Sequence, residues 1–216
     1  MADQVADVVN TIDQGGAEWE VGGELIERAG AIADTQAGQS SGAAGLVRRA
    51  GNLSVQVAAA GQGNGADTTD DVLFTFQVPA SAFDIAGRQL GVVAAGKFAA
   101  NANNKRIKLW FGTTTQTVGA AVAGGTLIAD SGVVATNAGG WEISATVTKY
   151  GAAGANTQLA SGAQALAGAV HLGTSVPVAL TADEAAAINV TVTGASPTTG
   201  AANDVLGQLL DVAWAQ

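Results

Sequence analysis

Few residues in this chain could do acid–base chemistry, and they are scattered. His171 is the only histidine among 216 residues, and the chain has no cysteine. A single imidazole cannot make a two-histidine metal site, and no thiol is present for it to activate. Val170 and Leu172 flank His171 as neighbours in a strand would, with their side chains on the opposite face. We therefore expect a strand histidine that the protein can do without.

Two groups of acidic residues could in principle do chemistry. Asp67, Asp70 and Asp71 could bind a hard cation such as Ca²⁺, but their spacing differs from that of an EF-hand loop, so a solvated turn before a strand is favoured. Asp183 and Glu184 are adjacent, so on a helix they diverge by about 100° and cannot act as an acid–base pair. The start of a short helical turn explains them better. The sequence thus predicts no catalytic residue, no metal site and no cofactor.

Two further patterns could bind a ligand. Residues 61–65 (GQGNG) have the glycines of a phosphate-binding loop but lack the Lys-Ser/Thr and the helix that would follow, so we expect a flexible linker. Trp19, Trp110, Trp141 and Trp214 could form a sugar-stacking face. They are dispersed and flanked by strand-like residues, so packing in the core or in a subunit interface is favoured.

Composition limits the possible partners. The formal net charge is −9 and the pI is near 4.3, so the surface repels phosphate backbones and we expect no nucleic acid partner. No long apolar run could span a membrane, and the N-terminus lacks the pattern of a signal peptide. Only 12% of the residues are charged, about half the usual share. Such a surface loses little solvation when a protein partner covers it.

From Leu53 onward the chain consists of short β-type runs separated by Gly, Asn, Asp and Thr clusters. The clearest run is 72–78. Residues 90–98 and 105–111, joined by an Asn-rich turn, predict a hairpin. Further strands are expected near 116–122, 126–128, 141–150, 157–161, 169–172, 176–180, 188–193 and 205–214. We expect one core between two sheets, formed by Phe74, Phe76, Phe98, Ile107, Leu109 and Phe111.

About ten short strands with almost no helix between them predict an all-β fold. We expect an antiparallel β-sandwich, jelly-roll-like, over residues 53–216, with an extended N-terminal arm over residues 1–52. The arm has too few apolar residues to form a core of its own, so we expect it to contact a neighbouring subunit or another protein. Its apolar residues are the candidate interface: Val5, Val8, Val9, Ile12, Trp19, Leu25 and Ile26.

Four segments carry a resemblance to a known family. Residues 70–83 (DDVLFTFQVPASAF), 96–112 (GKFAANANNKRIKLWFG), 127–151 (LIADSGVVATNAGGWEISATVTKYG) and 200–214 (GAANDVLGQLLDVAW) resemble jelly-roll virion structural proteins of tailed bacteriophages. The resemblance covers about residues 70–216, and its motifs are structural rather than catalytic. It implies a jelly-roll domain with no enzyme activity and no cofactor.

The resemblance and the composition together lead us to expect a structural virion protein. The leading hypothesis is a capsid decoration (cement) protein that binds the shell of major capsid protein and stabilises contacts between capsomers. It would be a homo-oligomer, a dimer or a trimer, assembled in the host cytoplasm and located on the outer capsid surface. Two alternatives stay open: a head-fibre or tail-fibre domain that contacts the host, and a carbohydrate-binding β-sandwich module that uses Trp110 or Trp141.

Overall fold

The computed structural model describes residues 51–135, 139–167, 170–172 and 177–215, together with two short strands nearer the N-terminus. The chain divides into two units, Met1–Arg49 and Ala50–Gln216. The described part of the first unit is an antiparallel pair of strands, β1 (Trp19–Val21) and β2 (Glu24–Ile26). No helix that could cross a membrane occurs among the described residues.

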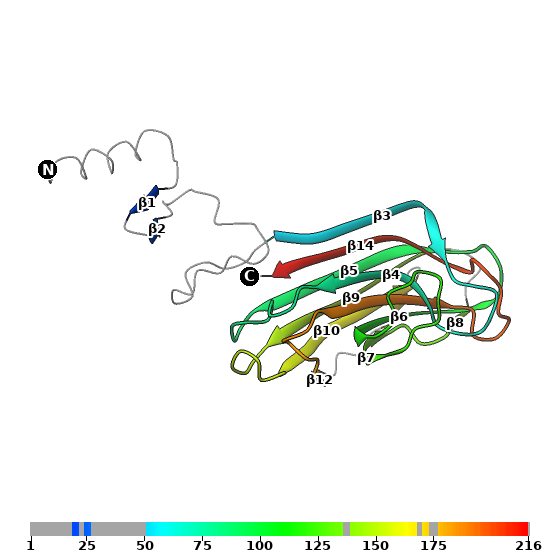
Figure 1. Ribbon diagram of the computed structural model, residues 1–216. Coiled ribbons are helices and arrows are strands. Elements are labelled where there is room, and N and C mark those ends of the chain that lie inside the picture. Colours follow the sequence, from blue (N-terminus) through cyan, green and yellow to red (C-terminus); the bar gives the residue numbers. More distant parts are fainter. Residues whose placement is uncertain are drawn as a thin grey trace, which may run out of the picture. The chain divides into compact units, whose positions relative to one another are not determined.

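The described part of the second unit is built from strands and the loops between them (Figure 1). The strands are β3 (Gly51–Gly63), β4 (Asp71–Val78), β5 (Gln89–Phe98), β6 (Asn104–Thr113), β7 (Gly124–Asp130), β8 (Val134–Ala135), β9 (Gly139–Lys149), β10 (Gln158–Ala167), β11 (Val170–Leu172), β12 (Val178–Leu180), β13 (Ile188–Ala195) and β14 (Val205–Ala215). All of their pairings are antiparallel.

The strands form two sheets that pack as a sandwich. The first has the order β11-β10-β9-β5-β14-β3, with β12 also paired to β10, and the second has the order β4-β13-β6-β7, with β8 paired to β6. If β3, β4, β5, β6, β7, β9, β13 and β14 are numbered one to eight, the sheets read 1-8-3-6 and 2-7-4-5, which is the strand order of a jelly roll. Strands β10, β11 and β12 extend the first sheet beyond β9. The predicted jelly-roll-like sandwich is confirmed.

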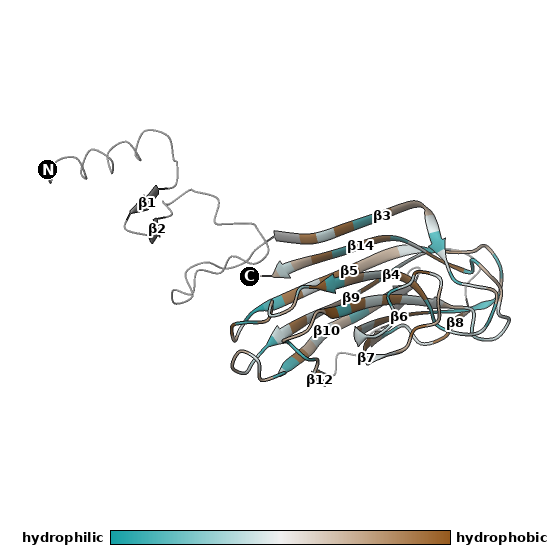
Figure 2. Cartoon of the chain, viewed as in Figure 1, coloured by the Kyte–Doolittle hydropathy of each residue, from teal (hydrophilic) through white to brown (hydrophobic). Residues whose placement is uncertain are grey.

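Apolar side chains that alternate along the strands fill the space between the sheets. The colours in Figure 2 show hydrophobic and hydrophilic residues alternating along the strands. The predicted core is confirmed for Phe74, Phe98, Ile107, Leu109 and Phe111, which are buried in one cluster. Phe76 is only partly buried and packs against the margin of that cluster. Both Leu73 and Phe74 belong to the cluster, because a register shift between β4 and β13 interrupts the period-two pattern there.

The predicted hairpin of residues 90–98 and 105–111 is wrong, although both strands exist. Strand β5 lies between β9 and β14 in the first sheet, whereas β6 lies between β13 and β7 in the second. The Asn-rich turn carries the chain from one sheet to the other. The side-chain amides of Asn101 and Asn103 donate to the Asp204 carboxylate at 2.6 and 2.9 Å. A carboxylate distant in the sequence therefore determines the conformation of this segment.

Residues 114–123 form a loop that folds back over the outer face of the second sheet, and the strand predicted over 116–122 is absent there. The loop starts at the end of β6 and reaches the start of β4, where Val72 N donates to Ala120 O at 2.9 Å. Thr191 of β13 points away from the core and is nevertheless fully buried. The loop therefore covers a polar layer of the sheet and also occupies part of the outer edge of β4.

Candidate interaction surface

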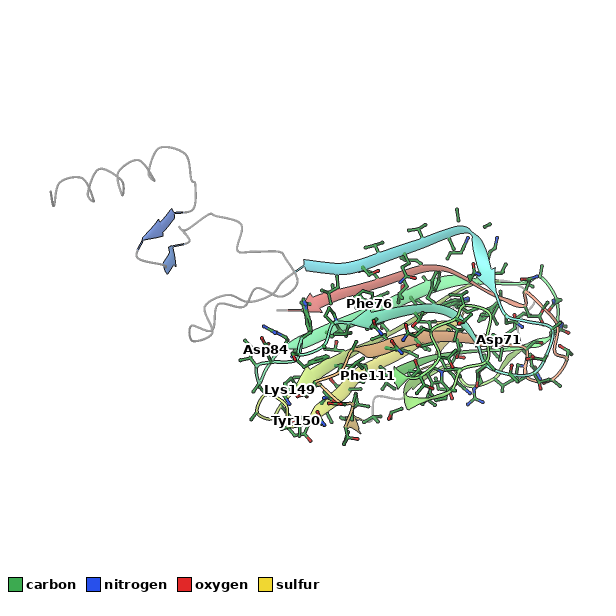
Figure 3. All side chains as sticks on the ribbon, viewed as in Figure 1. Asp71, Phe76, Asp84, Phe111, Lys149 and Tyr150 are labelled. Atoms are coloured by element: carbon green, nitrogen blue, oxygen red, sulfur yellow. The ribbon has the colours of Figure 1, made fainter. Side chains whose placement is uncertain are left out.

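A buried ion pair lies at one end of the sandwich, where Figure 3 labels Lys149. Lys149, at the end of β9, has no exposed surface, and its Nζ donates to the two carboxylate oxygens of Glu184 at 2.7 and 2.8 Å. Gln158 Nε2 also donates to Glu184, at 2.5 Å. Burial by itself would raise the pKa of Glu184, but the hydrogen bonds from Lys149 and Gln158 and the charge of Lys149 outweigh it, so the pKa lies below its usual range.

This cluster corrects the interpretation of Asp183 and Glu184 as the start of a helix. Residues 181–187 form turns rather than a helix. The Glu184 carboxylate is captured by Lys149, while Asp183 stays exposed and accepts a hydrogen bond from the backbone N–H of Ala185. An ionised carboxylate that already accepts hydrogen bonds from buried partners has no free lone pair facing solvent. The role of this cluster is therefore structural.

A second buried carboxylate lies at the other end of the strands. Asp204 is 1% exposed and accepts hydrogen bonds from Asn101, Asn103 and Ser196. Lys105 Nζ donates to the backbone oxygens of Asn101 and Asn103 at 2.8 and 3.0 Å, which fixes the same turn. Burial would raise the pKa of Asp204, but the three side-chain hydrogen bonds outweigh it and lower the pKa. At each end of the sandwich, a buried carboxylate and its hydrogen-bond partners therefore hold the loops in place.

The three acids around the start of β4 bond to different partners, as expected of a structural turn. Asp67 accepts the hydrogen bonds of its own turn, Asp70 pairs with Lys108 at 2.5 Å, and Asp71 is buried and accepts the backbone N–H of Gly65 at 2.6 Å. Within the described ranges, no group of three or more His, Cys, Asp or Glu side chains could hold a metal ion. Residues 61–63, predicted as part of a linker, belong to the end of β3.

The three tryptophans whose side chains are described do not share a face. Trp141 and Trp214 are buried in the core, which confirms the packing role expected for them. Trp110 is partly exposed on the outer side of the second sheet, and its Nε1 donates to Thr193 at 3.0 Å. A stacking platform of several tryptophans is therefore absent from the described side chains.

Several predicted positions lie outside what the structure describes. His171 falls in β11, and Trp19, Leu25 and Ile26 fall in β1 and β2, but their side chains are not among those described. Val5, Val8, Val9 and Ile12 lie outside the described residues, so the interface on the arm stays a prediction. Residues 38–42 (GQSSG) match the G-x-S-x-G spacing of hydrolase elbows and also lie outside them, but no strand-like apolar run precedes them.

An apolar surface that the sequence reasoning missed lies on the outer side of the first sheet. Val55 and Val57 of β3 are 51% and 71% exposed. Pairing across β3, β14 and β5 aligns two rows, which together we call the β3 face. The rows are Val55–Asp211–Val93 and Val57–Leu209–Ala95.

The β3 face contains one polar group without a described partner. Asp211 Oδ1 is shielded from solvent and accepts no hydrogen bond from the described part of the chain. A shielded acceptor is costly until a donor reaches it, so a covering partner that offers an N–H or O–H would relieve this cost. The signal in the sequence was the alternation of Val55 and Val57 within a strand that carries no charge.

Comparison with known proteins places few limits on the function. No protein-family model matches the chain, and no curated protein matches its sequence. Among solved structures, the chain is similar to the CBM2 module of the evolved Dit of Lactobacillus casei BL23 phage J-1. The identity is 8%, the match covers 65% of this chain and 67% of that chain, and the TM-score is 0.33. The function therefore has to be argued from the surfaces of the chain itself.

Proposed function

We propose that this chain is a non-enzymatic structural protein of a virus particle, and that it is a capsid decoration protein. It would bind the outer surface of an assembled shell of major capsid protein and stabilise the contacts between capsomers. The observation that carries the proposal is the β3 face, an exposed apolar surface on a sandwich whose buried carboxylates are engaged internally.

The β3 face has the properties of a surface that another protein covers. Removing apolar area from water is favourable by about 25 cal/mol per Å², and Val55 and Val57 offer such area. Asp211 adds an acceptor to which a partner could donate a hydrogen bond, and such a bond would fix the orientation of the partner. The mechanism is burial of an interface, repeated by symmetry over many copies, without a chemical step.

The resemblance to tailed-phage virion proteins supports the choice of partner. Its four segments contain β4, the end of β5 with most of β6, part of β7 with β8 and β9, and most of β14, so they fall on strands of the sandwich. Jelly rolls serve as capsid and lectin domains, and both uses depend on surface contacts. A homo-oligomer on the outer capsid surface, with no nucleic acid or membrane as partner, fits the acidic and sparsely charged composition.

The test combines location with a surface variant. Electron microscopy and quantitative mass spectrometry of purified particles should find the chain outside the shell in a copy number close to that of the capsomers. Leu209→Glu, in the middle of the β3 face, should abolish rebinding to particles that lack the protein. Ser144→Glu, on the outer side of the same sheet but outside the β3 face, is the matched control and should bind normally. Absence of the chain from particles would refute the proposal.

A fibre domain is the second candidate, and the β3 face would then be a contact between fibre subunits. Copy number separates the two functions, since a fibre domain would be found in a few copies at one site of the particle. The carbohydrate-binding alternative relied on Trp110 or Trp141 to stack on a sugar ring. Trp141 is 3% exposed, so a sugar cannot reach it. Trp110 alone is left for it, and binding to a glycan array that Trp110→Ala abolishes would favour that function.

A further inference from the structure

Strand β3 forms one edge of the first sheet, and this edge is long and neutral. It has 13 residues, from Gly51 to Gly63, and none of them is charged or proline. A free edge presents backbone N–H and C=O groups to which another strand can pair. Natural proteins normally blunt such edges with charges, prolines, bulges or covering loops.

The other edges of the two sheets are blunted in this way. The short strands β11 and β12 both pair along the outer side of β10. The 114–123 loop bonds to the edge of β4, and the Gln56 side chain donates to Thr75 O of the same edge at 2.8 Å. Strand β7 is short, begins with two glycines at positive φ, and has a register shift against β6. Strand β3 also has register shifts against β14, on both sides of its regularly paired segment Ser54–Val57. Among the described strands and loops, nothing pairs with the outer side of this segment, so it stands out as an open edge.

We propose that β3 pairs antiparallel with β3 of a second copy of this chain, about a two-fold axis through Gln56. This register places Val55 opposite Val57 of the second copy, and Val57 opposite its Val55. These exposed valines of the two copies would then pack against each other, and the two β3 faces would join into one surface. A two-fold contact of this kind is self-complementary and closes after two copies.

Electrostatics favours a second copy as the occupant. In a two-fold strand pair β3 meets only a copy of itself, so charges of one sign along β3 would repel each other, and β3 has no charged residue. The charged residue Asp211 lies opposite Val55, one strand away on β14. Two copies of Asp211 would be separated by three strand spacings, or at least about 14 Å. That distance exceeds the screening length of about 8 Å at physiological salt, so their repulsion is weak.

The inference rests on the proposed function in one respect, because it names the surface through which the proposed homo-oligomer forms. The absence of cysteine allows a direct test. In the full-length chain, Val55→Cys with Val57→Cys should form a covalent dimer on oxidation, because directly opposite residues lie about 4.5–5.5 Å apart at Cα, within disulfide range. Val55→Cys alone should give much less dimer, because its own copy is a diagonal neighbour about 7–8 Å away. Val93→Cys, on the same face but two strands further in, should give none.

A second measurement uses the full-length chain without cross-linking. Sedimentation should show a dimer whose dissociation constant rises at least tenfold in Val57→Lys, since lysine blocks edge pairing, but not in Val93→Lys. Val57 is 71% exposed, so its variant should fold, and circular dichroism checks this. A monomeric wild type, or a dimer that survives Val57→Lys, would overturn the inference. A dimer lost on removal of residues 2–50 but kept in Val57→Lys would assign the contact to the arm instead. In each of these cases decoration of particles could still be observed, so the proposed function is judged separately.

Discussion

A lysine without exposed surface needs a partner for its charge, and Glu184 provides one for Lys149. The pair does not by itself guarantee stability, because removing both charges from water costs about as much as their attraction returns. Its effect is to specify geometry. Gln158 and the backbone N–H of Thr157 also bond to Glu184, so the pair holds the loop after β9 against the turn before β13.

Neutralising Glu184 should therefore be much more harmful than its location in a turn suggests. Glu184→Gln keeps the shape of the side chain but leaves the buried Lys149 charge without a counter-charge. We expect the free energy of unfolding to fall by about 3–5 kcal/mol, measured by urea denaturation at pH 7. Asp183→Asn is the matched control next to it in an exposed position, and it should change the value by less than about 0.5 kcal/mol. Equal effects of the two variants would contradict the structural role of the ion pair.

The two buried carboxylates also predict how stability depends on pH. The folded pKa values of Glu184 and Asp204 are lowered, so each group contributes stability that is fully present above its unfolded pKa, about 4.3 and 3.9. That contribution is lost as the pH falls through the lower folded values, because the unfolded chain then binds more protons. Urea denaturation between pH 6 and pH 2.5 should show the loss below about pH 4.3. Glu184→Gln should have a shallower dependence in the same range, and an unchanged slope would count against Glu184.

At the scale of elements, close packing of neighbouring strands limits which residues β5 can carry. A Cβ on Gly96 would lie 2.0 Å from the backbone oxygen of Leu206 and 2.6 Å from a ring carbon of Trp141. Backbone on one side and a buried ring on the other cannot both give way. Gly91, in the same strand, has only a contact at 3.8 Å, with Ala213 O.

Gly96→Ala should consequently destabilise the sandwich by at least about 1–3 kcal/mol, the range for overpacking. Gly91→Ala is the control, since it fits without a clash and lowers the entropy of the unfolded chain, and it should be neutral or slightly stabilising. Thermal unfolding of both variants by circular dichroism compares them directly. Similar melting temperatures would mean that β5 and β14 can separate more easily than their contacts indicate.

The extents of most strands could be predicted from the sequence because period-two alternation is local. Trp141, Ile143 and Val147 are buried, as the alternation in β9 requires. The predictions were wrong where a residue distant in the sequence determines the local structure. The Asn101 turn follows Asp204, which lies 103 residues later, and Glu184 is taken by Lys149, 35 residues earlier. The conformational propensities of the local sequence do not reveal these partners.

At the scale of the molecule, the jelly roll could be predicted but the β3 face could not. Residues 51–57 contain the two alternating valines and no charge, which is also what a buried strand looks like. Whether such a strand is central or at an edge depends on the order of all the strands, and that order follows from contacts far apart in the sequence. The sequence instead directed attention to the apolar residues of the arm, whose role remains a prediction.

The arm provides the last prediction, because it separates what folds the chain from what binds its partner. The buried residues of the core cluster run from Leu73 to Trp214, so they all belong to the second unit. Deleting residues 2–50 should therefore leave the strand signal in circular dichroism and the melting temperature of the sandwich nearly unchanged. Ordering a segment costs about 1–2 kcal/mol per residue in backbone entropy, so an arm that binds the shell must bury its apolar residues there.

The truncated chain should accordingly bind particles much more weakly than the full-length chain at equal concentration, in a co-sedimentation assay. Replacing Val8, Ile12 and Trp19 by serine in the full-length chain is the matched control, because it removes three of the proposed anchors and keeps the length. It should reproduce most of the loss. Undiminished binding by both variants would assign shell attachment to the sandwich alone, and unfolding of the truncated chain would show that the arm belongs to the fold of the second unit.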